Sequence, residues 1–302
     1  MKKILAVCGA TASGKTALAV ECAKRLDGEI ISCDALLVYR GLNIGTAKPD
    51  EGERQGIPHY MIDVADPYDN FSVSDFERLA KPVLDDILSR GKTPVLCGGT
   101  GFYMNALLFP HSYGDTPASA EIRQKYIRLE QEKGREYLHG LLQSVDGESA
   151  KKIHFNDIKR VIRALEIYEL TGKKKSEQND APIPLSPYVA VAFDYPREEL
   201  YRRIGIRTQE MIGRGLVDEV RGLLASGVPK NAQCMQGIGY KEVVAYLENG
   251  GPQSTMSDII EKNTRNYAKR QLTFFKKMPY LYFITPQNTE QAAQEVLKIY
   301  ES

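Results

Sequence analysis

Short apolar runs alternate with amphipathic stretches over the first hundred residues of the chain. Residues 4–8 form an apolar run typical of a buried strand, and residues 16–26 repeat apolar side chains at helical spacing. The alternation continues with a strand expected at 29–32, an amphipathic helix within 71–90 and a buried strand at 93–97. This order predicts an α/β fold with a doubly wound parallel sheet, whose loops gather at one edge.

The pattern changes after about residue 112. Residues 116–171 have helical periodicity and no convincing strand, and the polar, proline-rich residues 172–187 predict a loop. Residues 188–193 again predict a strand, and from Arg197 to the end the pattern is helical. The expected domains are an α/β core of residues 1–114 and 186–302, with a helical C-terminal region, and an all-helical insertion of residues 115–185.

The segment between the first strand and the first helix matches the phosphate-binding P-loop pattern Gly-x4-Gly-Lys-Thr. Glycines let backbone N–H groups wrap around phosphate oxygens, and the N-terminus of the next helix adds partial positive charge. Lys15 can reach the phosphates, and the Thr16 hydroxyl can ligate Mg²⁺. A glycine-rich turn without a ligand is the alternative. The expected phosphate-binding residues are Gly9, Thr11, Ala12, Ser13, Gly14, Lys15 and Thr16.

A P-loop alone does not name a reaction. Most such proteins hydrolyse nucleoside triphosphates or transfer a phosphoryl group, which requires a second carboxylate near Mg²⁺. Asp194 follows the strand at 188–193, but Pro196 just beyond it favours the interpretation that Asp194 is a helix N-cap. Asp34 follows the second strand and is expected to face the bound phosphate, since the strand ends meet at one edge. Thr100, after the third core strand, either offers its hydroxyl to a phosphate oxygen or belongs to a plain turn.

Composition and charge mainly exclude classes of protein and kinds of site. The 302 residues are 42% hydrophobic and 26% charged with a net charge of +1, so any nucleic-acid surface must be local. No run approaches the roughly 20 apolar residues of a membrane helix, and the N-terminus lacks the apolar region of a signal peptide. Five scattered cysteines without CxxC spacing predict a reduced, cytoplasmic protein without a zinc site. No heptad pattern appears, which favours a monomer.

Two basic segments stand out in this nearly neutral chain, at 151–175 and 262–277. In the second, Lys262, Arg265 and Lys269 fall on one helical face, and aromatic residues interleave elsewhere. Such segments either bind RNA phosphates or are solvated helix faces whose aromatic residues pack in the core.

Several segments together resemble the tRNA dimethylallyltransferase family, whose members are also called tRNA isopentenyltransferases. The match runs in order through nearly the whole chain, and residues 44–49 and 264–271 are its most specific parts. The matching segments are 9–16, 34–49, 56–63, 71–76, 98–103, 160–166, 236–242 and 264–271.

The resemblance implies a reaction. A dimethylallyl group would pass from dimethylallyl diphosphate to N6 of the adenosine 3′ of the anticodon, in tRNAs that read codons starting with U, and diphosphate would leave. The P-loop and Mg²⁺ would hold the diphosphate, and no ATP would be consumed. Asp34 matches the family's general base, and Thr100 and Arg207 would stabilise the leaving group.

The resemblance also implies that the insertion grips the tRNA anticodon stem-loop and that the target adenine is flipped into a channel. Ala35 and Leu37 replace a serine and a glutamine that are common in the family. The implied tRNA-binding residues are Asp34, Ala35, Leu36, Leu37, Thr100, Arg123, Lys159, Arg160, Arg163, Gly239, Tyr240, Lys241, Arg265, Lys269 and Arg270.

Three other functions stay open at this point. An isopentenyltransferase acting on free AMP, ADP or ATP would need neither the insertion nor the basic segment at 262–277. A P-loop kinase or NTPase would need a second Mg²⁺ carboxylate. A non-enzymatic, nucleotide-dependent RNA-binding protein would have no need of Asp34 beside the P-loop.

Overall fold

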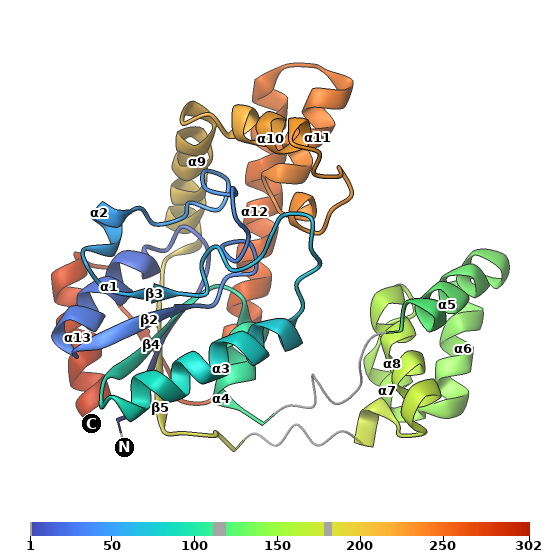
Figure 1. Cartoon of the computed structure of the whole chain (residues 1–302), viewed down its shortest axis with the longest axis horizontal. Coiled ribbons are helices and arrows are strands. Elements are labelled where there is room, and N and C mark those ends of the chain that lie inside the picture. The colour runs from blue at the N-terminus through green and yellow to red at the C-terminus, as the bar shows by residue number, and fades with distance from the viewer. Residues whose placement is uncertain (1, 111–118, 178–182) are drawn as a thin grey trace. The chain divides into compact units, whose positions relative to one another are not determined.

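A six-stranded, all-parallel sheet forms the centre of the computed structural model, which describes residues 2–110, 119–177 and 183–302 (Figure 1). The strand order is β3-β2-β4-β1-β5-β6. The chain starts near the middle of the sheet and builds outward in both directions, which confirms the doubly wound fold. The strands are β1 (Ile4–Cys8), β2 (Gly28–Ser32), β3 (His59–Tyr60), β4 (Thr93–Gly98), β5 (Tyr188–Phe193) and β6 (Leu281–Ile284).

Four of these strands, β1, β2, β4 and β5, confirm the strands expected from apolar runs. The expectation that the chain is helical from Arg197 to its end is wrong at β6, which pairs with β5. This strand is only four residues long and lies at the sheet edge, partly exposed. Its strand conformation depends on pairing with β5, which local periodicity does not report.

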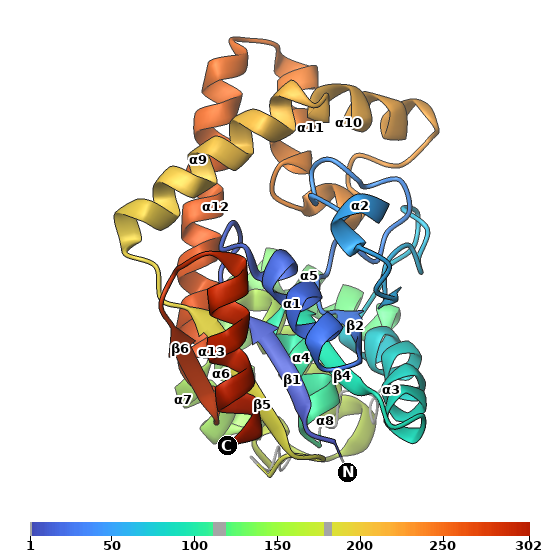
Figure 2. The same ribbon diagram turned by 90° about the vertical axis from the view of Figure 1, so that its left-hand side faces the viewer.

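Helices cover both faces of the sheet (Figures 1 and 2). On one face, α1 packs against α13, and Leu18 of α1 shares a core with Leu5 and Val7 of β1. On the other face lie α3 and α4, which pack against each other. The bounds are α1 Lys15–Arg25, α2 Glu51–Arg54, α3 Val73–Ser89, α4 Gly101–Leu108 and α13 Thr289–Glu301.

Four further helices in the C-terminal part of the chain extend the α/β core beyond the carboxyl edge of the sheet. Ile204 of α9 and Ala268 of α12 are buried together against Ala10 of the P-loop, so both helices are anchored beside that loop. None of the described helices is both long and apolar enough to span a membrane. The bounds are α9 Arg197–Gly213, α10 Leu216–Ala225, α11 Tyr240–Asn249 and α12 Gln253–Phe275, with a short 3-10 turn, η2, at Cys234–Gln236.

Asp194 is not the N-cap of α9, which corrects the favoured interpretation. Pro196 holds the cap position, and no side chain caps the helix. The Asp194 N–H instead donates to the Ile284 carbonyl, which extends the pairing of β5 with β6 by one residue.

Residues Phe109–Ile183 form a separate compact unit. Its described residues, 109–110, 119–177 and 183, contain helices and no strand, and its core includes Leu138, Leu142 and Val161. The limits expected from the sequence were 115 and 185, and residue 115 lies outside the described residues. The elements are α5 Ala120–Lys133, α6 Arg135–Val145, α7 Gly147–Lys152, α8 Ile158–Thr171 and the 3-10 turn η1 Lys175–Glu177.

A buried carboxylate in β2 gives the fold a specific acid sensitivity. Glu29 accepts two hydrogen bonds from Arg90, at 2.7 and 2.6 Å, and one from the Tyr60 hydroxyl at 2.9 Å. The Arg90 hydrogen bonds, more than any other interaction, hold the pKa of Glu29 at about 2, below its usual 4.5. A pKa that is lower in the folded state adds stability above pH 4.5, and this is lost as the pH falls toward 2.

We therefore expect Glu29→Gln to cost about 2 kcal/mol of unfolding free energy at pH 7, allowing for the partial exposure of Arg90. The difference from wild type should shrink between pH 4.5 and 2 in urea unfolding curves. A difference that stays constant over this range would show that Glu29 contributes packing rather than charge.

Candidate active site

The P-loop, residues 9–14 between β1 and α1, has a conformation that other parts of the chain must hold in place. Ala12 has a φ of 62°, in the left-handed region that costs a non-glycine residue about 1 kcal/mol. Two long-range hydrogen bonds brace the loop. Arg203 Nε donates to the Ala12 carbonyl at 2.8 Å, and the Thr11 N–H donates to Gln271 Oε1 at 2.9 Å.

Gln271 also ties the P-loop to the turn after β4. Its Nε2 donates to the Gly99 carbonyl at 3.0 Å, and a Cβ on Gly99 would lie only 2.1 Å from that nitrogen. Gln271 ends the matching segment 264–271, but the sequence assigned it no function. The available signal was a polar residue on the buried face of a helix, three residues after Ala268 and four before Phe275, both fully buried.

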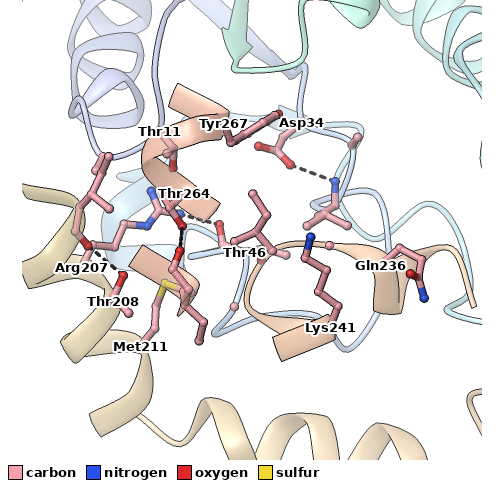
Figure 3. A pocket seen from close by; sticks show the side chains of 18 of the residues that line it. Thr11, Asp34, Thr46, Arg207, Thr208, Met211, Gln236, Lys241, Thr264 and Tyr267 are labelled. Atoms are coloured by element: carbon pink, nitrogen blue, oxygen red, sulfur yellow. Dashed lines mark hydrogen bonds between the residues drawn. The ribbon is translucent and has the colours of Figure 1, made fainter. Parts of the chain in front are cut away.

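Two neighbouring cavities lie at this edge of the sheet. The larger, about 400 Å³, is here called the reaction cavity, and the smaller, about 50 Å³, the P-loop cavity. Thr11, Asp34, Thr46 and Arg207 line both cavities, so they stand where the two meet. Figure 3 shows their side chains in the reaction cavity. The reaction cavity is completed by residues of the loop after β2 and of the C-terminal helices, among them Ala35, Leu36, Met211, Gln236, Lys241, Thr264, Tyr267 and Arg270.

The Asp34 side chain is held in a tight turn. Its Oδ1 accepts from the Leu36 N–H at 2.9 Å and from the Leu37 N–H at 3.4 Å. This turn, which caps the segment after β2, leaves the carboxylate facing both cavities. A carboxylate placed there can accept a proton from a group in the reaction cavity while a phosphate occupies the P-loop cavity.

Thr100 lines neither of these two cavities. Its hydroxyl accepts from the Ala35 N–H at 3.0 Å. The expected contact of Thr100 with a leaving diphosphate or RNA stays a prediction. The Thr100 hydroxyl positions the backbone next to Asp34.

Two cations flank the P-loop cavity. Burial lowers the pKa of Lys15, and the positive charge of Arg207 lowers it further, whereas Cys97 and Asp34 oppose the shift. Burial likewise lowers the pKa of Arg207, whose Nη2 donates to the Thr46 carbonyl at 3.2 Å. A bound anion would offset this cost, because it supplies the opposite charge that desolvated cations lack.

The P-loop cavity suits Mg²⁺ bound together with a phosphate. The Thr16 hydroxyl and the Asp34 carboxylate line it, and both are hard oxygen donors. The described residues contain no group of three or more histidine, cysteine and acidic side chains that could hold a metal by themselves. Mg²⁺ commonly takes one or two protein oxygens and completes its shell with phosphate oxygens and water. The Ser32 hydroxyl, buried in this cavity without a hydrogen-bond partner among the described residues, fits such a hydrated ion.

The expected RNA-binding residues of the core unit fall into different places. Ala35, Leu36, Lys241 and Arg270 line the reaction cavity, whereas Leu37 lines the P-loop cavity. Figure 3 shows the Lys241 amine pointing into the reaction cavity.

Tyr240 is fully buried, which corrects the expectation that it contacts RNA directly. Its hydroxyl donates to Glu219 at 2.7 Å, and Glu219 also accepts from the N–H groups of residues 43–45. Gly239, with a φ of 97°, begins the same helix, and its N–H donates to Glu242. These residues fix the loop that carries Thr46, which in turn accepts from Arg207.

The basic residues of α12 do not form one surface. Arg270 lies over the Tyr267 ring at the reaction cavity. Lys269 lines a separate cavity with Tyr201 and Asp194. Arg265 is ion-paired with Glu261 at 2.6 Å and lies over Tyr201. Only Arg270 of these three thus lines the cavity that contains Asp34.

In the helical unit, two of the expected RNA contacts share a buried carboxylate as their partner. Arg123 and Arg163 both pair with the fully buried Glu166, at 2.9 and 2.6 Å. Lys159 and Arg160 are exposed on α8, and Arg160 pairs with Asp157. Arg123 and Arg163 therefore stabilise α5 against α8, whereas Lys159 and Arg160 present charge to solvent.

Comparison with known proteins gives consistent matches. Residues 37–278 match a family model described as IPP transferase. The chain is 45% identical over 287 residues to the tRNA dimethylallyltransferase of Acetivibrio thermocellus, which covers 94% of this chain and 92% of the relative.

Two solved structures are similar over nearly all of the chain. One is the full-length tRNA isopentenylpyrophosphate transferase of Bacillus halodurans, with a TM-score of 0.71, 38% identity, and coverage of 100% of this chain and 97% of the other. The second is a eukaryotic dimethylallyltransferase described as acting on tRNA, with a TM-score of 0.84, 28% identity, and coverage of 98% and 78%.

Proposed function

The chain belongs to the IPP transferase family, and from that membership we propose that it transfers a dimethylallyl group from dimethylallyl diphosphate to N6 of an adenosine in tRNA, releasing diphosphate. The observation that carries this proposal is the position of Asp34. Its carboxylate lines both the P-loop cavity, which is suited to an anionic leaving group, and the reaction cavity, which has room for a base.

The chemistry follows from this arrangement. The adenine N6 attacks the allylic carbon of the donor, a C–N bond forms, and the C–O bond to diphosphate breaks with its electrons going to the diphosphate. Asp34 takes the proton from N6. Lys15 and Arg207 stabilise the charge that develops on the diphosphate. Mg²⁺, held by Thr16 and diphosphate oxygens, would neutralise part of the same charge.

We further propose that the acceptor is the adenosine 3′ of the anticodon, presented by an anticodon stem-loop. Lys241 and Arg270 at the reaction cavity can bind phosphates beside a flipped base, and Lys159 and Arg160 offer further positive charge. We take the protein to act as a cytoplasmic monomer. Its five cysteines are all free and buried, which suits a reducing compartment.

The kinase alternative is less well supported. Of the two candidates for its second Mg²⁺ carboxylate, Asp194 lines the cavity with Tyr201 and Lys269 rather than the P-loop cavity, and Asp34 is the general base of the reaction proposed here. An enzyme acting on free AMP has no use for the helical unit.

A transfer assay tests the proposed function directly. The protein is incubated with labelled dimethylallyl diphosphate, Mg²⁺ and either unmodified tRNA or AMP, without ATP. Label should enter tRNA that carries adenosine 3′ of the anticodon, and not the same tRNA with guanosine there. Label in AMP and not in tRNA would overturn the tRNA assignment.

Gln271 should act as a positioning residue for the P-loop. Gln271→Met keeps the side-chain length but leaves the Thr11 N–H and the Gly99 carbonyl without their buried partner, at a cost of about 1–3 kcal/mol. We expect kcat/KM for dimethylallyl diphosphate to fall about tenfold while the Kd for tRNA stays unchanged.

Gln209→Met is the matched control, because the Gln209 amide donates to Ser257 on α12 and lines neither cavity. A Gln271→Met protein that loses thermal stability but keeps wild-type kcat/KM would show that Gln271 is needed for folding only.

A further inference from the structure

Two buried polar atoms in the P-loop cavity have no hydrogen-bond partner among the described residues. They are Ser32 Oγ, at the end of β2, and His59 Nε2, at the start of β3. Burying a polar atom without a hydrogen-bond partner is costly. Such atoms in a cavity therefore point to a bound group that supplies the missing hydrogen bonds. The reaction proposed above assigns neither residue a function.

The register of the sheet places both side chains on one face. Ile30 of β2 is paired with His59 of β3, and Ser32 follows Ile30 by two residues, so the three side chains point the same way. Ile30 shares a core with Leu18 of α1, the helix that the P-loop leads into. Ser32 and His59 therefore face the P-loop side of the sheet, toward the cavity that Thr16 also lines.

The hydrogen-bonding state of His59 limits what can bind there. Its Nδ1 lies 2.8 Å from the Ile57 carbonyl, which can only accept, so Nδ1 carries the proton. Burial lowers the pKa of His59, which favours the neutral ring. Nε2 is then an acceptor, and a deprotonated diphosphate oxygen cannot pair with it. The missing partner must be a donor.

We propose that Ser32 and His59 are outer-shell residues of the Mg²⁺–diphosphate site, each accepting a hydrogen bond from a water molecule bound to the metal. This inference rests on the proposed function, in which Mg²⁺ and diphosphate occupy the P-loop cavity. Mg²⁺ keeps several of its waters, and these are strong donors because the ion polarises them. Residues that orient metal ligands in this way commonly change metal affinity by about 10–100-fold.

The test measures metal-dependent binding of inorganic diphosphate to the full chain, by isothermal titration at several Mg²⁺ concentrations and in EDTA. The variants are Ser32→Ala and His59→Phe. For each we expect the Mg²⁺ concentration that gives half-maximal diphosphate binding to rise about tenfold, while the weak binding in EDTA stays at its wild-type value. Ser32→Ala removes a hydroxyl that has no partner among the described residues, so this variant should unfold at the wild-type temperature. If His59→Phe fails to fold, Ser32→Ala alone decides between the outcomes.

Ser257→Ala is the control, because Ser257 is equally buried and lines neither cavity. An unchanged Mg²⁺ requirement in Ser32→Ala would overturn the inference and leave the proposed function standing. Equal weakening with and without Mg²⁺ would overturn it too, since it would mean direct contact with diphosphate. A wild-type protein that binds no diphosphate in Mg²⁺ would instead refute the proposed P-loop ligand.

Discussion

Replacing Asp34 by asparagine should lower the rate of prenyl transfer by about 10²–10⁴-fold, the usual contribution of a general base. The weakly nucleophilic adenine amine must lose a proton as the new bond forms, and asparagine cannot take it. Affinity for tRNA should change by less than about threefold, because the amide keeps the size of the carboxylate. Single-turnover transfer and filter binding measure the two quantities separately.

Asparagine is the informative substitution because of the turn that Asp34 closes. Its carbonyl oxygen can still accept from the Leu36 and Leu37 N–H groups, whereas alanine would open the turn. Asp66→Asn is the control, since Asp66 pairs with Arg40 at the exposed surface. A variant that loses tRNA binding as severely as transfer would mean that Asp34 reads the RNA, and full activity would place the base elsewhere.

The parts of the site that are local in sequence were predictable. The P-loop can be recognised in the sequence because one short segment supplies its glycines, its lysine and its threonine. Asp34 was expected at the same edge because the carboxyl ends of parallel strands meet there, and the sheet confirms that geometry. Buried strands of five or six residues were likewise visible as apolar runs.

The contacts that were missed join distant parts of the chain. Gln271 braces Thr11 from 260 residues away, and Arg203 reaches Ala12 across 191 residues. Likewise, β3 is a two-residue strand that pairs beside β2, so nothing local predicted that His59 and Ser32 would share a cavity.

Family motifs also contain both residues that contact a ligand and residues that hold the protein's own structure in place. Tyr240 lies in a matching segment, yet its hydroxyl holds Glu219 in the protein interior. Arg123 and Arg163 match expected RNA contacts, yet both neutralise the buried Glu166. A motif shows that a residue type is needed at a position, and only the surrounding packing shows for which purpose.

Replacing Lys15 by methionine should lower kcat/KM for dimethylallyl diphosphate by about 10²–10³-fold. The substitution removes the buried positive charge that stabilises the departing diphosphate. Methionine preserves the length and apolar stem of the side chain, so the loss reports the ammonium group. Steady-state transfer at saturating tRNA measures it. Thermal unfolding of the variant checks that the loop still folds.

The pH dependence tests the same charge in the wild-type protein. Burial, above all, lowers the pKa of Lys15 below 10.5 in the free protein, and only the protonated amine attracts diphosphate. Affinity for inorganic diphosphate should therefore fall as the pH rises through this lowered pKa, at a lower pH than for an ordinary lysine. Lys15→Arg should remove that alkaline decline, since a guanidinium stays charged, even if its bulk weakens binding at pH 7. An alkaline decline that persists unchanged in Lys15→Arg would assign the titration to another group and leave Arg207 as the main cation of the site.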